Sequence, residues 1–233
     1  MDPQSIVKYL DFTLLNLEAS DDELTKFCHR ANEFRPIAVC VFSKHAKFVR
    51  PLLDKEISLA VVASGFPEGS TDIDKIRDSI SKACTEYVDE VDVVLEPRSE
   101  DFPNETDLLR LVAMREAAGN SILKVILETP LLEERPLRAV VRMALAAGAD
   151  FVKSCTGKRG ICSEEAASIL AYEVMRHERA FNEQKGLKLS GGIRTIEDVN
   201  RLTRLVEAED SSIIQSGSKR FRIGASSLLD ELA

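Results

Sequence analysis

The sequence lacks any long hydrophobic run. No window of its 233 residues approaches 18 consecutive uncharged apolar residues, the length that indicates a transmembrane helix. The first ten residues, MDPQSIVKYL, also lack the basic start and the apolar stretch of a secretory signal peptide. We therefore expect no association with a membrane, and we predict a cytoplasmic location.

Patterns that bind metals or form disulfides are also missing. The five cysteines are odd in number and contain no CxxC pair, and the three histidines are scattered along the chain. Structural zinc sites use closely spaced pairs of these residues. The sequence therefore predicts free thiols and no structural metal; the cysteines are Cys28, Cys40, Cys84, Cys155 and Cys162.

Positive charge is in the minority. The chain has 31 Lys and Arg against 39 Asp and Glu, a formal net charge of -8. An acidic chain disfavours nucleic acid or an anionic membrane as its main partner. Its length fits one domain with a substantial core. A small soluble substrate is the better expectation.

Short apolar runs alternate with longer segments of helical periodicity, which predicts a parallel sheet of βα units. Eight runs have the length of strands, and the segment 207–219 is irregular enough to predict a surface loop. The expected strands are 9–13, 37–42, 58–64, 90–95, 122–127, 150–154, 186–190 and 221–226. The clearest expected helices are 21–33, 71–85, 107–118, 135–147, 163–179 and 195–207.

The strand count favours a closed barrel over an open sheet. Eight strands match a (β/α)8 TIM barrel, and the first strand is not followed by the GxGxxG of an open dinucleotide-binding sheet. We predict that residues 1–233 form a single barrel domain with an N-terminal helical cap.

Four charged residues lie inside these apolar runs at barrel spacing. Asp92, Lys124, Lys153 and Lys188 are 32, 29 and 35 residues apart by subtraction, close to the roughly 30 residues of a βαβ unit. Residues at the carboxyl ends of barrel strands build the active site. The spacing therefore predicts that Asp92, Lys153 and Lys188 share one pocket.

Converging lysines suggest chemistry at an amine. A lysine attacks a carbonyl only when it is unprotonated, and a second cation together with desolvation lowers its pKa. Lys188 could do this for Lys153, while Asp92 could move protons directly or through water. Taken singly, a strand lysine more often extends its charged end to solvent, and Asp92 could be a structural partner of a lysine.

Glycine-rich segments after the last strands predict an anion site. Gly191 and Gly192 follow one strand, and Gly224 to Ser227 follow the next, where barrels commonly bind phosphate. We expect the segment from Thr156 to Lys158 to add a backbone donor and a cation. Such glycines also form ordinary turns. Their occurrence in two loops favours a phosphorylated substrate.

Six segments of the chain stand in order at barrel spacing: YLDFTLLN, EVDVVLEP, LKVILET, DFVKSCTGK, KLSGGIRT and RIGASSLL. They resemble the successive signatures of deoxyribose-phosphate aldolase, a class I aldolase of the (β/α)8 fold. The resemblance runs from about Tyr9 to Leu229. It implies reversible cleavage of 2-deoxy-D-ribose 5-phosphate to D-glyceraldehyde 3-phosphate and acetaldehyde, in deoxyribonucleoside catabolism, with no metal or other cofactor.

The resemblance also implies roles for individual residues. Lys153 would form the Schiff base, Lys188 would lower its pKa, and Asp92 would relay protons. Residues matching the phosphate cradle are Gly157, Lys158, Gly191, Gly192, Gly224, Ser226 and Ser227. Residues matching the pocket lining are Asp11, Thr13, Cys40, Lys124 and Thr156.

The chain departs from the family at a few positions. Ser154 and Cys155 stand where a threonine and a serine are usual, Leu189 replaces a usual proline, and Cys155 adds an oxidisable thiol. The C-terminal tyrosine tail of some relatives has no counterpart before Ala233. Alternatives therefore stay open: a non-catalytic sugar-phosphate-binding or scaffold paralogue, or an aldolase for another acceptor aldehyde. Relatives are often homodimers, so a homodimer is one assembly open to this chain.

Overall fold

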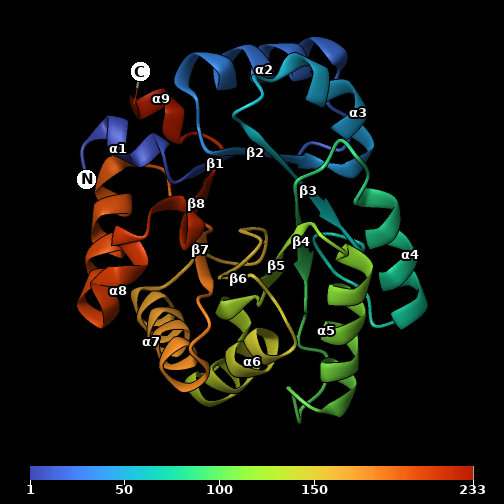
Figure 1. Cartoon of the computed structure of the whole chain (residues 1–233), viewed down its shortest axis with the longest axis vertical. Helices are drawn as coiled ribbons and strands as arrows, with labels where there is room; N and C mark the ends of the chain where they lie inside the picture. The colour runs from blue at the N-terminus through green and yellow to red at the C-terminus, as the bar shows by residue number, and fades with distance from the viewer. Residues whose placement is uncertain (233) are drawn as a thin grey trace.

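Eight parallel strands form a closed barrel at the centre of the molecule (Figure 1). This computed structural model describes residues 1–232. Each strand pairs with its neighbours in the chain, and β1 closes the ring by pairing with β8. The predicted (β/α)8 fold is confirmed. The strands are β1 (Leu10–Leu14), β2 (Ala38–Phe42), β3 (Ser58–Ala63), β4 (Glu90–Val94), β5 (Ile122–Ile126), β6 (Phe151–Lys153), β7 (Gly186–Ser190) and β8 (Phe221–Ala225).

Helices follow the strands and form the outer ring of the molecule (Figure 1). No helix within residues 1–232 has both the length and the apolar character needed to cross a membrane. The helices are α1 (Pro3–Val7), α2 (Asp21–Phe34), α3 (Ala46–Val49), α4 (Ile73–Ala83), α5 (Glu105–Ala118), α6 (Glu134–Ala146), α7 (Glu164–Phe181), α8 (Ile196–Gln215) and α9 (Leu228–Leu232). Short 3-10 turns are η1 (Ser43–His45), η2 (Arg50–Leu52), η3 (Thr129–Leu131) and η4 (Gly217–Lys219).

Polar side chains fix where several helices begin. Ser20, Asn104 and Thr195 each precede a helix and form a capping box with the acidic residue three positions later. Each box satisfies backbone N–H groups that have no partner within the helix. These local signals explain why the predicted helices appear close to their expected positions.

The prediction of a surface loop over 207–219 is wrong for most of this segment. Helix α8 runs to Gln215 with one interruption at Asp210, whose backbone is extended at φ -160° and ψ 105°. The Asp210 carboxylate accepts the Ser212 N–H over 2.9 Å and so restarts the helix. Ile213 and Ile214 on the restarted turn are buried in the core. The final turn is held by this tertiary packing.

Alternation along the strands separates an apolar shell from a charged interior. On β4, Val91 and Val93 belong to the large core between barrel and helices, so Glu90 and Asp92 face the inside of the barrel. The interior also contains a small apolar cluster from β2 to β5: Cys40, Ala60, Val62, Phe66, Val94 and Ile126.

Candidate active site

A cavity of about 360 Å³ opens at the carboxyl ends of β1, β6, β7 and β8. Its size lies within the range of small-molecule sites, roughly 300–1,000 Å³. All seven residues predicted for a phosphate cradle line it, together with Lys153, Thr13 and Thr156. The other lining residues are Leu14, Leu15, Asn16, Ser190, Ile193, Arg194 and Ala225.

Lys153 and Lys188 meet at Asp92. Lys153 Nζ lies 2.9 Å from Asp92 Oδ2, and Lys188 Nζ lies 2.8 Å from the same oxygen. The three residues come from β6, β7 and β4 and converge inside the barrel. The structure therefore brings together the three residues predicted to act on substrate. Of the two lysines, only Lys153 lines the cavity.

Lys124 and Asp11 extend this cluster below the cavity. Lys124 Nζ contacts Asp11 Oδ2 at 3.2 Å and Asp92 Oδ1 at 3.0 Å, and Lys188 Nζ lies 2.5 Å from Asp11 Oδ2. Asp11, Lys124 and Cys40 are fully buried, and none of them lines the cavity. These three expected lining residues thus form part of the barrel interior beneath it.

The sequence reasoning missed two further charged groups of the interior, Glu90 and Arg222. Arg222 donates to Asp11 Oδ1 at 2.8 Å and to Glu90 Oε1 at 3.0 Å. Glu90 Oε2 in turn lies 2.5 Å from Lys124 Nζ. Both residues are buried. They join the predicted lysines and aspartates into one continuous network of ion pairs.

The network fixes the charge of most of its members. Burial alone would raise the pKa of Asp92, but the ammonium groups of Lys124, Lys153 and Lys188 outweigh it and hold that pKa well below the usual value of 3.8. Burial opposes the charged form of Lys124 and Lys188 as well, yet Asp11 and Asp92 raise the pKa of both amines. Lys124 and Lys188 are therefore held as cations.

Two glycines bring the loops of the cradle together. Gly157 and Gly191 have φ of 74° and 95°, a region that favours glycine. A Cβ on Gly157 would lie 3.2 Å from the Gly191 backbone, and one on Gly191 would lie 2.3 Å from Cys155 Sγ. The loops after β6 and β7 can pack this closely only without side chains here.

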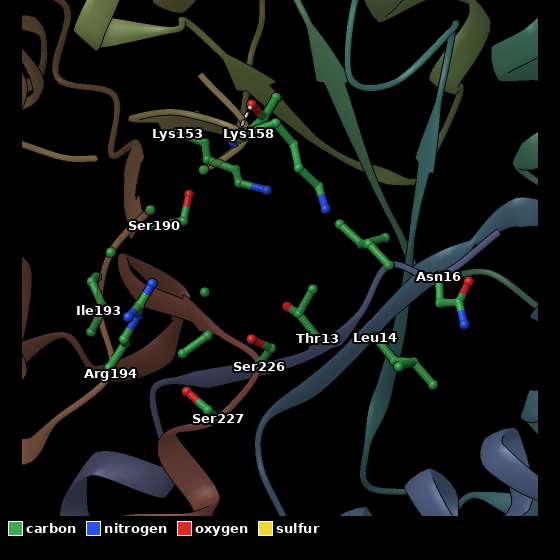
Figure 2. A pocket seen from close by; sticks show the side chains of 17 residues that line it. Thr13, Leu14, Asn16, Lys153, Lys158, Ser190, Ile193, Arg194, Ser226 and Ser227 are labelled. Carbon is green, nitrogen blue, oxygen red and sulfur yellow. Dashed lines mark hydrogen bonds between the residues drawn. The ribbon is translucent and has the colours of Figure 1, made fainter. Parts of the chain in front are cut away.

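Cations and hydroxyls surround the space that these loops enclose. Figure 2 shows Lys153 and Lys158 on one side of the cavity and Ser226 and Ser227 on the other. Arg194, which the sequence reasoning missed, also lines the cavity. Two cationic side chains besides Lys153, with hydroxyl donors, suit a phosphate group.

A second set of contacts ties the loop after β6 to the opposite rim. The Thr156 N–H donates to Glu128 Oε1 over 2.7 Å, and Arg159 Nε lies 3.9 Å from Glu128 Oε2. Arg159 also donates to the Pro67 carbonyl over 3.1 Å and pairs with Glu96. These contacts link the segment bearing Lys158 to the loops after β3, β4 and β5.

The positions that depart from the resemblance are hydrogen-bonded or buried in this structure. Ser154 Oγ donates to the Ser190 carbonyl over 2.8 Å and accepts the Ser190 N–H over 2.9 Å. Leu189 is buried in the outer core, away from the cavity. Burial raises the pKa of the Cys155 thiol to about 11. Its burial and raised pKa both disfavour the oxidation expected of this free thiol.

Among residues 1–232, no group of three or more His, Cys, Asp or Glu side chains could hold a metal ion. The five cysteines are free. The side chains that line the cavity supply two amines, a guanidinium and several hydroxyls, and the Asp92 carboxylate contacts the Lys153 amine.

The fold and this site define a class of protein. A closed (β/α)8 barrel carries its site at the carboxyl ends of its strands, as barrel enzymes do. No protein-family model matches the chain. Solved structures with the same fold do match it.

The chain is similar over its length to several aldolase structures. A "putative deoxyribose-phosphate aldolase" from Coccidioides immitis is 29% identical, with 100% of this chain and 86% of that chain covered and a TM-score of 0.83. A structure described as QR15, an aldolase, is 25% identical over 95% of this chain and 91% of that one, with a TM-score of 0.74. The tetrameric deoxyribose phosphate aldolase of Aeropyrum pernix shares the fold at 24% identity. The match covers 99% of this chain and 91% of that chain, with a TM-score of 0.77.

These likenesses confirm the resemblance to deoxyribose-phosphate aldolases. The chain is an enzyme of the aldolase kind, a lyase.

Proposed function

We propose that this enzyme is a Schiff-base aldolase that reversibly cleaves 2-deoxy-D-ribose 5-phosphate to D-glyceraldehyde 3-phosphate and acetaldehyde. One observation carries the proposal: Lys153 lines the cavity while its amine and that of Lys188 contact one oxygen of Asp92. Lys153 is the nucleophile, and Lys188 is the cation that favours its neutral form.

The reaction begins with attack of neutral Lys153 on the substrate aldehyde carbon. Loss of water gives a protonated imine, which draws the electrons of the C2–C3 bond as a base removes the C3 hydroxyl proton. Glyceraldehyde 3-phosphate leaves, and the remaining enamine is protonated at C2 and hydrolysed to acetaldehyde. Asp92, held ionised at pH 7, is the group proposed to move these protons, directly or through water.

The phosphate is proposed to bind among the glycine loops of the cavity. Backbone N–H groups of these loops can approach an anion closely, and Lys158, Arg194, Ser226 and Ser227 add charged and neutral donors. Anchoring the far end of the substrate would orient its aldehyde toward Lys153. The proposal therefore includes specificity for a phosphorylated sugar.

The first test is a coupled assay for acetaldehyde release from 2-deoxy-D-ribose 5-phosphate, paired with borohydride trapping. With acetaldehyde and borohydride, peptide mass spectrometry should find an ethyl adduct on Lys153, and Lys153→Leu should show neither adduct nor turnover. Substrate binding that raises the melting temperature without acetaldehyde release would favour a sugar-phosphate-binding or scaffold protein instead. Faster turnover of another sugar phosphate would favour a different acceptor aldehyde.

The proposed reaction implies a role in deoxyribonucleoside catabolism in the cytoplasm. A homodimer also stays a prediction, and light scattering on the purified protein would test it.

A further inference from the structure

The barrel interior holds more cations than anions. The network contains four cationic and three anionic side chains, so their ordinary charges at pH 7 sum to one positive charge, since 4 - 3 = 1. By strand, the titratable groups facing the interior are Asp11 on β1, Cys40 on β2, Glu90 and Asp92 on β4, Lys124 on β5, Lys153 on β6, Lys188 on β7 and Arg222 on β8.

Two other groups near the interior leave this count unchanged. Burial raises the pKa of the Cys40 thiol to about 11, so the thiol is neutral. Glu128 lies at the rim, where it binds the Thr156 N–H and faces Arg159. β3 contributes only apolar residues to the inner cluster, Ala60 and Val62.

The four cations are compensated unequally. Lys124 contacts three carboxylates, and Lys188 and Arg222 contact two each. Among the carboxylates of residues 1–232, Lys153 contacts only Asp92. A buried set with an unbalanced charge favours loss of one proton. Lys153 has the fewest opposing charges, so its neutral form disturbs the network least.

Arg222 is the member of the set that cannot release a proton. Besides Asp11 and Glu90 it donates to the Ser218 carbonyl over 2.5 Å, and its guanidinium lies 5.6 Å from the centre of the Phe151 ring. It is 4% exposed and does not line the cavity. Its effect on substrate must therefore pass through other residues.

We infer that Arg222 is a positioning residue whose fixed charge gives the interior its excess cation and so favours neutral Lys153, an inference that rests on the proposed aldolase function. Arg222 holds Asp11, which also binds Lys188. Glu90 acts in the opposite sense, because it adds an anion to the same set. The excess of one charge, and not only the presence of Lys188 at the same oxygen of Asp92, sets the pH at which Lys153 reacts.

Variants that change the net charge of the buried network test this inference. Arg222→Met leaves three cations and three anions, so Lys153 should become reactive only at a pH higher by about one unit or more. Glu90→Gln should shift the reactive pH downward. The double variant Arg222→Met with Glu90→Gln restores an excess of one and should return the profile toward that of the wild type. Arg222→Lys keeps the charge and should leave the profile close to the original.

Two readouts separate this inference from the proposed function. The pH dependence of acetaldehyde release reports turnover, and the pH dependence of Lys153 methylation by formaldehyde and cyanoborohydride, read by peptide mass spectrometry, needs no sugar substrate. If wild type releases no acetaldehyde, the proposed function fails, and the labelling profiles still test the inference.

An unchanged labelling profile in folded Arg222→Met would overturn the inference. If that single variant does not fold by circular dichroism, Glu90→Gln and the double variant decide the matter. A downward shift in Glu90→Gln that is reversed in the double variant supports the charge count. The same profile in both variants contradicts it.

Discussion

Lys153 and Lys188 share a single oxygen atom, Oδ2 of Asp92, at 2.9 and 2.8 Å. Two ammonium groups on one oxygen repel each other at short range, and the cation with fewer carboxylate partners is the one that benefits from losing its proton. Lys188 has a second carboxylate partner in Asp11, whereas Lys153 has none beyond Asp92 within residues 1–232. The shared oxygen thus supports the proposal that Lys188 stays a cation while Lys153 is the nucleophile.

Replacing Lys188 with Met should slow the enzyme in a pH-dependent way. Without this cation, a neutral Lys153 would leave the interior with two cations and three anions, so its proton is retained. We expect activity at pH 7 to fall by about 10²-fold or more and to recover partly as the pH rises. Steady-state rates from pH 6 to 10 would measure this.

Lys158→Met is the matched control, because it removes a lysine that lines the cavity outside the buried network. It should change substrate affinity without moving the pH profile. A Lys188→Met profile parallel to that of the wild type would refute the role assigned to Lys188.

Arg194→Met should weaken recognition of the phosphate specifically. A charge-assisted hydrogen bond contributes about 1.5–3 kcal/mol, so KM for 2-deoxy-D-ribose 5-phosphate should rise about tenfold to a hundredfold. The rate with unphosphorylated 2-deoxy-D-ribose should change little. Equal losses on both sugars would show that Arg194 serves the cavity in some other way.

Arg159 should affect substrate binding through the loop that it holds. Arg159→Gln removes its ion pair with Glu96 and its approach to Glu128, which anchors the Thr156 N–H. We expect KM to rise several-fold with a smaller change in kcat, since Lys153 is untouched.

Arg98→Gln is the control for this loop. Arg98 also pairs with Glu96 but has no contact with Glu128 or with the loop after β6 among the described hydrogen bonds and ion pairs. It should leave KM nearly unchanged. A comparable rise in both variants would indicate that general loosening of the rim, and not the link to the loop after β6, controls binding.

The positions of the strands could be predicted from the sequence, because short apolar runs bounded by helix-capping residues carry a local signal. Features that depend on contacts between distant segments could not. Glu90 is two residues before Asp92, and Arg222 two before Gly224, so strand alternation could have placed both inside the barrel. The residues around Glu90 and Arg222 in the sequence give no sign that these two side chains pair across the barrel.

The remaining errors have the same origin. Ile213 and Ile214 hold the end of α8 only because the barrel surface lies beneath them. The direction of the Arg194 side chain depends on a loop whose glycines have positive φ. For Asp11, Lys124 and Cys40, membership in the barrel was predictable. Their depth below the cavity depends on how the strands are staggered.

The thiols should react slowly with alkylating reagents. Burial raises the pKa of Cys40 and Cys155 to about 11 and that of Cys162 to about 12. At pH 8, iodoacetamide should therefore modify the partly exposed Cys84 first, with the three others reacting only on unfolding. Peptide mass spectrometry over time would measure the order. Early modification of Cys155 would show that the loop after β6 opens in solution.

Stability should fall in acid because of Asp11 and Asp92. Burial opposes their ionisation, but the neighbouring lysines outweigh it and depress both pKa values below the usual 3.8. The unfolded chain therefore binds protons that the folded chain does not, so the free energy of unfolding decreases as pH falls below about 4. Urea unfolding at pH 7, 5 and 3 would measure it, and equal values at pH 5 and 3 would contradict the prediction.

Lys124 and Lys188 make the free energy of unfolding depend on pH in the opposite direction. Their pKa values are raised above 10.5 in the folded protein. Their contribution to stability is complete below that value and is lost as the pH rises through the folded pKa. The network thus supports folding across the neutral range.

Lys153 and the proposed phosphate cradle line the same cavity. In the condensing direction, an acceptor aldehyde held there by its phosphate would have only one face of its carbonyl turned toward the enamine on Lys153. The carbonyl carbon becomes the new stereocentre. The proposed reaction should therefore create that centre with a single handedness.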